Sequence, residues 1–373
     1  MKIKGVFIIK KKLLILSRHS SLDVRGGIEF VLDDYITELS KKYTNVTHLA
    51  TSQKAREQID NNIKVKLYNG ITFVKNILSI RYVFDSLKLC KGRTVNIHFP
   101  FIPGAIVGAL LTKDTKIIVT WHCDVVLAGL PKLIYALLVP LVESTLKKSS
   151  KIIVTSQNII DSTKLLKKYK DKCNICHIPL KPLNNDIKTK KIIGLPREYI
   201  IFIGRLVDYK GLKVIINLYS NHSHELPPIV LAGQGPLSKD LIKLSKHNPA
   251  KVIFIDRIIS EEEKNYLIEN SRFMVFPSNT RAEAFGVVQL EAMRYGKPVI
   301  NTELGTGTSY VSKDGVTGIT VRPNSVNELK KAIIDLYDDK KMQTEFSKNA
   351  KERIKTHFSY EKFANNLIKI FDV

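Results

Sequence analysis

Short apolar runs alternate with amphipathic stretches along the whole chain. In the first half, runs typical of buried strands cover 12–17, 46–50, 63–67, 94–98, 116–121, 151–155 and 175–178. Stretches with helical spacing cover 28–42, 104–111, 133–148 and 159–170. Strands and helices that alternate in this way predict a parallel, doubly wound α/β sheet, which binds ligands at the carboxyl ends of its strands.

A polar stretch rich in lysine and asparagine, 181–191, predicts a linker between two domains. A second strand–helix series follows it, with strands predicted at 199–203, 228–232, 252–255, 272–276 and 299–301. Ser260 and Glu263 form a capping-box pattern that predicts the start of a helix ending near Asn270. We therefore predict a first domain over 1–183, a second over 184–355, and a C-terminal segment over 356–373 with a helix at 359–371.

Composition is that of a soluble globular protein. The 373 residues are 44% hydrophobic and 25% charged, which is enough for two domains with separate cores. The most apolar stretch, 125–142, contains Lys132 and two prolines and is too short to cross a bilayer comfortably. The first ten residues resemble an extension rather than a signal peptide, because their apolar core is only 6–9. These features predict a cytoplasmic protein.

The four cysteines fit a reducing compartment. Cys173 and Cys176 form a C-x-x-C followed by His177, but a zinc site would need a second ligand pair at suitable spacing. A redox motif should open a helix, whereas this one leads into an apolar run typical of a strand. We therefore expect no metal or redox function at these cysteines.

The charge is concentrated in the first half of the chain. Residues 1–190 hold 32 Lys/Arg and 14 Asp/Glu, or +18, and residues 191–373 hold 27 and 21, or +6, which sum to the net +24. This asymmetry suggests a polyanionic partner, either nucleic acid or an anionic membrane surface, unless it is only a lysine-rich surface. The apolar segment 133–142 is consistent with a helix packed on the sheet or with a patch for a lipid.

The candidate site with the most chemistry is the loop 278–286, between the strand predicted at 272–276 and a helix predicted at 287–294. Glu283 lies in this loop and Glu291 on the helix, so the two carboxylates flank a helix N-terminus. Backbone N–H groups at a helix N-terminus favour anions, and carboxylates accept hydrogen bonds from hydroxyls. A sugar nucleotide offers both phosphates and hydroxyls.

Two further loops of the second domain carry cations and glycines. Arg205 and Lys210 follow the strand at 199–203, and a guanidinium with an ammonium suits a diphosphate. Gly233 and Gly235 follow the next strand. The chain contains neither a dinucleotide fingerprint after a strand nor a P-loop, which argues against a nicotinamide enzyme, a nucleotide hydrolase and a kinase.

In the first domain, Gly26 and Gly27 lie between a strand and a helix, where glycine lets the backbone approach a ligand. His98 and His122 both fall at predicted carboxyl ends of strands. A lone histidine there is often structural, and on the residues alone both readings remain open.

Several of these segments together resemble one enzyme family. Residues 283–291, EAFGVVQLE, resemble the Glu-x7-Glu signature of retaining glycosyltransferases with the GT-B fold, glycosyltransferase family four. Residues 204–211 and 26–29 resemble the phosphate-binding and glycine-loop segments of that family. The loop 302–311 resembles an O-antigen and capsule mannosyltransferase-like subgroup. The resemblance is strongest over 200–322, and it departs at Asp256, where relatives often have glycine.

The resemblance implies two Rossmann-like doubly wound domains that face each other across a cleft. The first domain would bind the acceptor, the second would bind the donor, and the last helix would cross back to the first domain. His122 would face the donor sugar, with Glu283, Arg205 and Lys210 completing the catalytic set. The implied donor-binding residues are Gly27, Arg205, Lys210, Gly233, Gly235, Glu283, Ala284, Phe285, Gly286 and Glu291.

The resemblance implies a retaining hexosyltransferase that extends a lipid-linked saccharide in O-antigen or capsule synthesis. GDP-mannose is the first choice of donor, and a UDP- or dTDP-sugar is the alternative. The chain has no Asp-x-Asp segment to hold a metal between phosphates, so we expect no cofactor and no metal. We expect an enzyme peripheral on the inner face of an anionic inner membrane.

Two rival hypotheses belong to other functional classes. A basic nucleic-acid-binding protein on a Rossmann-like scaffold would need basic residues interleaved with aromatics, a pattern these lysines lack. A degenerate scaffold without activity would not need the intact set Arg205, Lys210, Glu283 and Glu291.

Overall fold

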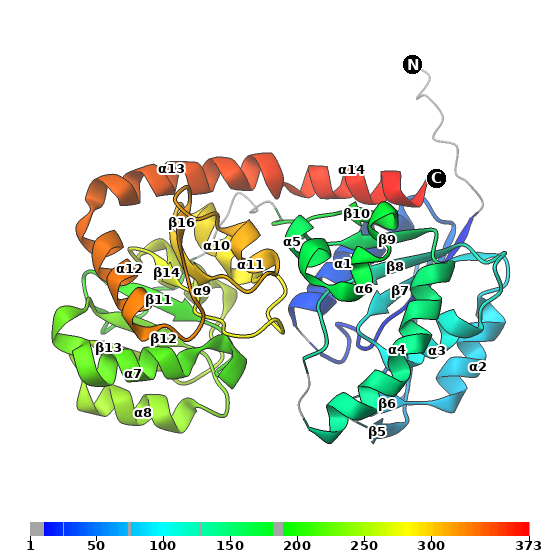
Figure 1. Ribbon diagram of the computed structural model, residues 1–373, viewed down its shortest axis with the longest axis horizontal. Helices are drawn as coiled ribbons and strands as arrows, with labels where there is room; N and C mark the ends of the chain where they lie inside the picture. The colour runs from blue at the N-terminus through cyan, green and yellow to red at the C-terminus, as the bar shows by residue number, and fades with distance from the viewer. Residues whose placement is uncertain (1–10, 25, 74–75, 127–128, 182–188, 373) are drawn as a thin grey trace, which may run out of the picture. The chain divides into compact units, whose positions relative to one another are not determined.

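The structure, a computed structural model, describes residues 11–24, 26–73, 76–126, 129–181 and 189–372 (Figure 1). The chain divides into two compact units. Unit 1 comprises Met1–Ile178 together with Phe363–Val373, and unit 2 comprises Pro179–Lys362. Each unit contains one large sheet with its own buried core, which confirms the predicted α/β fold class.

The sheet of unit 1 has the strand order β10-β9-β8-β7-β1-β2-β4-β3, and every neighbouring pair is parallel except β3 with β4. Its strands are β1 (Lys12–Leu16), β2 (Asn45–Thr51), β3 (Arg56–Asp60), β4 (Ile63–Tyr68), β7 (Arg93–Phe99), β8 (Ile117–Trp121), β9 (Lys151–Val154) and β10 (Cys173–Ile175). A separate hairpin pairs β5 (Ile71–Phe73) with β6 (Asn76–Leu78). Because β1 is flanked by β2 and β7, the strand order reverses direction there, as at the ligand-binding edge of other doubly wound sheets.

The helices of unit 1 are α1 (Gly27–Ser40), α2 (Ile80–Leu89), α3 (Ile102–Leu110), α4 (Leu130–Lys148), α5 (Gln157–Ser162), α6 (Lys164–Lys167), η1 (Lys170–Lys172) and, from Phe363 on, most of α14 (Tyr360–Phe371). Helices α2, α3 and α4 pack in a row, as Figure 1 shows. At Gly108 of α3 a β-carbon would collide with the side chain of Thr145 on α4, so the close crossing of these two helices requires glycine.

The sheet of unit 2 is entirely parallel, with the order β13-β12-β11-β14-β15-β16. Its strands are β11 (Ile200–Ile203), β12 (Ile229–Ala232), β13 (Val252–Ile255), β14 (Met274–Val275), β15 (Val299–Thr302) and β16 (Gly318–Val321). Counted along the unit this is the order 3-2-1-4-5-6, whose switch point lies between β11 and β14. Ligands of such sheets bind outside the carboxyl ends of the strands at that point.

The helices of unit 2 are η2 (Asp208–Lys210), α7 (Leu212–His222), η3 (Ser223–Glu225), α8 (Ser238–His247), α9 (Glu261–Glu269), α10 (Val287–Arg294), α11 (Gly307–Val311), α12 (Val326–Asp338) and α13 (Lys340–His357). Helices α12, α7 and α8 lie side by side in that order (Figure 1). The predicted capping box is confirmed, because the Ser260 hydroxyl accepts from the Glu263 amide and the Glu263 carboxylate accepts from the Ser260 amide.

Two predicted elements need correction, and one strand of unit 2 was not predicted. The single helix predicted over 159–170 is α5 followed by α6, because the backbone of Thr163 is extended and its hydroxyl donates to Asp124. The strand predicted at 175–178 is β10, Cys173–Ile175, which pairs with β9. Strand β16 was not predicted, because its short run begins with a glycine buried against β15.

The two compact units divide at Ile178 and resume at Phe363, instead of at the predicted 183/184 and 355/356. The linker prediction falls largely on 182–188, and the predicted extension on 1–10, both outside the described residues. The acceptor-binding and donor-binding roles of the two domains stay predictions. In the part of the chain that the structure describes, no helix is both long and apolar enough to cross a membrane.

Candidate functional site

Two loops at the switch point of unit 2 are pinned to each other. One follows β11 and ends at Gly211, and the other follows β14 and begins at Phe276. Gly211 has a φ of +73°, and a β-carbon there would collide with the carbonyl oxygen of Pro277. The Asn279 amide donates to the Tyr209 carbonyl at 2.9 Å. Only glycine fits this close approach, which brings Lys210 toward the second loop.

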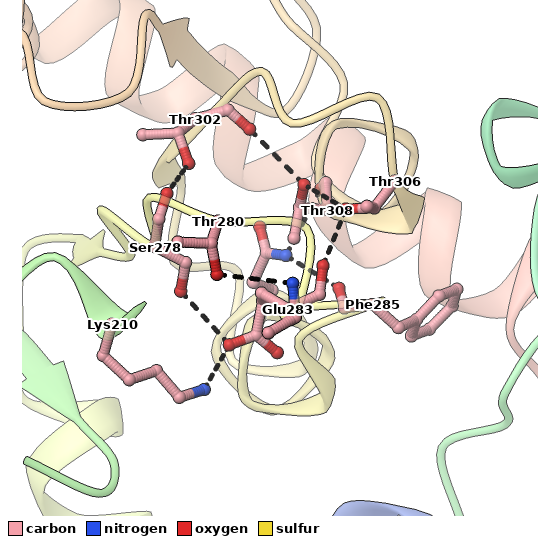
Figure 2. Close-up of polar contacts among 10 residues, drawn as sticks. Lys210, Ser278, Thr280, Glu283, Phe285, Thr302, Thr306 and Thr308 are labelled. Atoms are coloured by element: carbon pink, nitrogen blue, oxygen red, sulfur yellow. Dashed lines mark hydrogen bonds and ion pairs between the residues drawn. The ribbon is translucent and has the colours of Figure 1, made fainter. Parts of the chain in front are cut away.

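Glu283 and Lys210 form an ion pair across these two loops (Figure 2). Their side chains are only 11% and 14% exposed, respectively. The Ser278 hydroxyl donates to the same carboxylate oxygen of Glu283 at 3.1 Å. The Lys210 ammonium lies 5.0 Å from the ring centre of Phe276, which adds a cation–π contact. The structure therefore brings together two residues that the sequence analysis assigned to the donor.

Three successive carbonyl groups of the Glu283 loop accept hydrogen bonds from the protein. Thr306 Oγ1 donates to the Glu283 carbonyl at 2.8 Å, as Figure 2 shows. The Gly307 amide donates to the Ala284 carbonyl at 2.7 Å, and Gln289 Nε2 donates to the Phe285 carbonyl at 3.0 Å. Because these carbonyl groups are hydrogen-bonded to other parts of the protein, the loop has a fixed conformation.

Several amide groups at the end of this loop and the start of α10 remain available to a ligand. Among the described residues, the N–H groups of residues 284–288 find no acceptor, whereas the Glu283 amide donates to the Thr280 carbonyl at 3.1 Å. Gly286 caps α10 with a φ of +78° and no side-chain cap. Free amides at the N-terminus of α10, with the helix dipole behind them, form a binding site for an anion such as phosphate.

A buried polar network supports this loop. Asn301 on β15 donates to the Gln289 side chain at 3.0 Å and to the Thr308 carbonyl at 2.9 Å. Both Gln289 and Asn301 are fully buried. This network was not predicted from the sequence. An asparagine inside the apolar run 299–302 was a usable signal, because a buried amide side chain needs hydrogen-bond partners.

The loops after β11 and β12 pack backbone against backbone. A β-carbon at Gly233 would collide with the Gly204 carbonyl, and one at Gly235 would lie 2.5 Å from the Leu206 carbonyl oxygen. The Leu206 amide also donates to the Gln234 carbonyl at 3.0 Å. Gly233 and Gly235 therefore have a packing role here, and their role in binding the donor stays a prediction.

Arg205 and Asp256 lie near these loops. The Arg205 side chain is exposed and contacts no carboxylate among the residues described, so its guanidinium is accessible to a ligand. Asp256, the departure from the family pattern, accepts a hydrogen bond from the Ser238 hydroxyl at 2.7 Å. That bond links the end of β13 to the start of α8.

Glu291 has a partner that the sequence analysis did not identify. Lys264 of α9 lies 2.8 Å from the Glu291 carboxylate, and their side chains are 15% and 23% exposed. Burial lowers the pKa of Lys264, but the carboxylates of Glu291 and Glu261 outweigh burial and raise it overall. No sequence motif marked Lys264, because its pairing depends on how α9 packs against α10. Glu291 stays a predicted donor-binding residue, and its carboxylate pairs with Lys264.

In unit 1, two predicted strand-end histidines meet. His98 is the second-last residue of β7 and His122 follows β8, and His98 Nδ1 lies 2.8 Å from His122 Nε2. His98 Nε2 lies 2.7 Å from the side-chain oxygen of Asn96. Burial lowers the pKa of His122 to about 4 and lowers that of His98 well below its usual value. Both rings are therefore neutral at pH 7.

The remaining predicted positions of unit 1 are Gly27 and the two cysteines of the C-x-x-C. Gly27 opens α1, and a β-carbon there would meet nothing within 4 Å, so packing does not require glycine. Cys173 and Cys176 are free thiols, and burial raises the pKa of the Cys176 thiol to about 12, so it stays protonated. Throughout the described ranges, no cluster of three or more His, Cys, Asp or Glu could hold a metal ion.

The sequence of this chain is similar to known proteins. Residues 184–353 match the family model described as "Glycosyl transferases group 1". The chain is 28% identical over 283 residues to O-antigen chain mannosyltransferase C of Escherichia coli, covering 74% of each chain. It is 30% identical over 272 residues to D-rhamnosyltransferase WbpZ of Pseudomonas aeruginosa, covering 71% of this chain and 69% of the relative.

Solved structures share the fold. Sucrose-phosphate synthase from Thermosynechococcus elongatus superposes with a TM-score of 0.73 at 17% identity, covering 97% of this chain and 98% of that one. HepE from Anabaena, solved in complex with UDP, gives a TM-score of 0.70 at 16% identity, covering 96% and 98%. At this level of identity the likeness concerns the fold alone.

Proposed function

Since this chain belongs to the group 1 glycosyltransferases and has their GT-B fold, we propose that it is a retaining hexosyltransferase of family four. The proposed donor is GDP-mannose, and a UDP- or dTDP-sugar is the alternative. The proposed acceptor is a lipid-linked saccharide in the synthesis of a surface polysaccharide, O-antigen or capsule. The similarity to an O-antigen chain mannosyltransferase supports this donor and this pathway class.

The observation that carries the proposal is the row of free amides at residues 284–288 beside the Lys210–Glu283 ion pair. When a sugar nucleotide reacts, the bond from the sugar to its diphosphate breaks, and negative charge grows on the diphosphate. Fixed amides stabilise that charge without reorganisation, and an ammonium and a guanidinium add positive charge. Lys210 and Arg205 would supply the two cations.

The carboxylates would bind hydroxyls rather than act as acid and nucleophile. Glu283 would accept hydrogen bonds from the hydroxyls of the sugar while Lys210 turns partly toward the phosphate. Glu291, held by Lys264, would accept from the ribose. Hydrogen bonds to charged groups contribute about 1.5–3 kcal/mol each, which is enough to orient the donor for transfer.

Thermal-shift measurements with GDP, UDP and dTDP test the donor site. A ligand that binds only the native state stabilises it by about 2.7 kcal/mol at 100 times its Kd. We expect the largest rise in Tm with GDP, and a larger rise with UDP or dTDP would make that nucleotide the donor. Lys210→Met should lose the shift, whereas Lys213→Met should keep it, because Lys213 forms an exposed pair with Asp208. If no nucleotide raised the Tm, the donor site would be wrong.

The exposed start of α4 supports a location at the membrane. No side chain from Leu130 to Pro140 is buried. Leu130, Leu133 and Leu137 are 68%, 66% and 79% exposed, and they share one face of the helix. The buried residues of α4, which are Val142, Thr145 and Leu146, all lie in its second half. Of the two alternatives for 133–142, the exposed leucines therefore favour an apolar patch over a helix packed on the sheet.

Charge complements this apolar face. Lys132 and Lys147 of α4 are exposed, and the first half of the chain carries the excess of +18. Each lysine near an anionic surface contributes about 1 kcal/mol, and inserted leucines add an attraction that salt does not screen. We propose that this face rests on an anionic membrane and brings the enzyme to its lipid-linked acceptor.

Vesicle flotation tests the membrane proposal. We expect binding to anionic vesicles to exceed binding to neutral ones and to weaken with salt, since the Debye length falls from about 10 Å at 0.1 M to about 3 Å at 1 M. The variant Leu133→Ser/Leu137→Ser should lose the binding that remains at high salt. The matched variant Ile193→Ser/Ile258→Ser changes two exposed residues of unit 2 and should bind as the wild type does.

Nucleic acid provides the decisive competition. The same flotation is repeated with an excess of duplex and single-stranded nucleic acid, which we expect not to displace the protein. If nucleic acid displaced it while anionic vesicles failed to float it, the rival hypothesis of a basic nucleic-acid-binding protein would replace the membrane proposal.

A further inference from the structure

The hydrogen bonds of unit 1 form a chain that ends at His122. Asn96 Nδ2 lies 3.1 Å from the Ile118 carbonyl oxygen and 3.0 Å from Thr120 Oγ1. The side-chain oxygen of Asn96 lies 2.7 Å from His98 Nε2, and His98 Nδ1 lies 2.8 Å from His122 Nε2. Asn96, His98 and His122 are all buried, with exposed fractions of 0%, 3% and 4%.

The Ile118 carbonyl at the start of this series of hydrogen bonds determines which of its atoms carry the protons. A carbonyl oxygen only accepts, so the Asn96 atom next to the Ile118 carbonyl must be the NH2 group. The other amide atom is therefore the oxygen, which also only accepts. Its partner, His98 Nε2, must then carry a proton and donate it.

The same logic fixes the second histidine. A neutral imidazole has one N–H and one lone pair, so a proton on His98 Nε2 leaves His98 Nδ1 as an acceptor. His122 Nε2 must donate to it, and His122 Nδ1 is then left with the lone pair. Protonation of His98 would break this order, but its burial and the two neighbouring histidines, His122 and His48, keep its pKa low.

His122 directly follows the carboxyl end of β8, and doubly wound sheets bind ligands outside this edge. Its backbone amide donates to the Phe99 carbonyl at 3.0 Å, which fixes the start of the loop after β8. The edge of the Tyr35 ring packs on His98 at 5.4 Å between ring centres, which restricts rotation of that ring.

We propose that Asn96 and His98 are positioning residues that hold His122 in the Nε2–H tautomer, so that Nδ1 accepts a hydrogen bond from a hydroxyl of the sugar. This inference rests on the proposed function, in which His122 contacts the donor sugar. It also narrows the ligand chemistry, because a neutral acceptor nitrogen binds a hydroxyl or an N–H and repels a phosphate or a carboxylate. His122 would therefore select a hydroxylated, uncharged part of the substrate.

Nitrogen NMR of the full-length protein with labelled histidine tests the tautomer directly and needs no donor. We expect His122 to show a protonated Nε2 and an unprotonated Nδ1 from pH 6 to pH 8. A spectrum with the proton on Nδ1 would overturn the inference, whether or not the protein transfers sugar.

Variants test the positioning role. His98→Leu removes the acceptor for His122 Nε2–H, so the fixed tautomer should be lost and kcat should fall at least ~5-fold, about the contribution of one hydrogen bond. His98→Gln offers a side-chain oxygen in place of Nδ1 and should restore most of the loss. His247→Leu is the control, since His247 is an exposed histidine of unit 2 that bonds the Lys243 carbonyl and lies outside this chain of hydrogen bonds.

The outcomes separate the inference from the proposed function. An unchanged His122 tautomer in a folded His98→Leu protein would overturn the positioning role. Normal kcat in His122→Ala would overturn the contact with the sugar, even with the predicted tautomer present. If the protein transferred no sugar at all, the proposed function would fail, whereas the NMR result on the wild type would still decide the tautomer.

Discussion

The two units carry their candidate groups on the same kind of scaffold but use opposite electrostatics. In unit 2, charged and amide groups meet at the switch point, where Lys210 and Glu283 pair beside free backbone amides. In unit 1, the strand ends carry His98 and His122, which burial keeps uncharged. A diphosphate needs fixed positive potential, whereas a sugar hydroxyl needs only an oriented acceptor.

Their surfaces differ as well. Among the described residues, the exposed large apolar side chains of unit 2 are Ile193, Ile242 and Ile258, which are scattered. Unit 1 has many more, and those of α4 share one face. Isolated exposed apolar residues are ordinary, but a contiguous face marks a binding surface. This difference agrees with the proposal that unit 2 binds a soluble charged donor and unit 1 an amphiphilic acceptor.

The largest difference between the two units should be in their stability at low pH, which should fall more in unit 1 than in unit 2. His48 and His122 each have a pKa of about 4 in the folded protein, against 6.5 for a free histidine. Between these values the unfolded chain binds more protons, so stability falls as pH drops from 6.5 toward 4. At pH 5 the loss is about 2 kcal/mol for each, or roughly a thousandfold in the unfolding equilibrium for both.

Hydrogen exchange of separate peptides measures this difference. Amides of β7 and β8 should lose protection between pH 7 and pH 5, after correction for intrinsic rates, while those of β11 and β12 should change little. His247→Gln removes an exposed histidine of unit 2 and should leave the pH dependence unchanged. Equal loss of protection in both units would contradict the assignment of neutral buried histidines.

Lys210→Met should reduce kcat by about 100-fold, as expected when one fixed group that stabilises developing charge is removed. The double variant Lys210→Met/Glu283→Gln separates chemistry from stability, because it also neutralises the carboxylate left without its cation. We expect Lys210→Met to lower the Tm, and we expect the double variant to restore the Tm without restoring activity. Steady-state kinetics with the donor identified by thermal shift measure the effect. Activity that returned with Tm would mean that Lys210 is structural.

Glu283→Ala should leave the fold intact and reduce transfer at least ~10-fold, because hydrogen bonds to a charged group contribute about 1.5–3 kcal/mol. Turnover with saturating donor is the measurement, and circular dichroism checks the fold. Glu269→Gln, on the exposed end of α9, serves as the control. Turnover close to that of the wild type would remove Glu283 from the catalytic set.

EDTA should have the smallest effect of all. We expect transfer to continue at an unchanged rate, because Arg205, Lys210 and the free amides would take the place of a metal at the donor phosphates. Assays with and without EDTA, followed by addition of magnesium or manganese, check this. Activity that EDTA abolished and a metal restored would reveal a metal site and weaken the role of the two cations.

The sequence by itself determined the α/β class, the loops that follow buried strands, and the chemical groups those loops carry. Apolar runs identify strands locally, and Glu283, Lys210 and the capping box at Ser260 are each visible within a few residues of the chain. The resemblance to a glycosyltransferase family also depends on contiguous segments such as 283–291. Information of this kind is local, so it survives without knowledge of the fold.

Only the tertiary structure decided which of these groups meet. Lys264 and Glu291 come from separate helices, and their contact depends on helix packing. His122 follows β8 and meets His98 of β7 because these two strands are neighbours in the sheet. The same holds for burial, because the apolar segment 133–142 looks suitable for a core, but Val142 is its one buried residue. A hydrophobic pattern shows that a side chain avoids water, whereas the neighbours that the fold supplies determine what covers it and which polar groups remain unpaired.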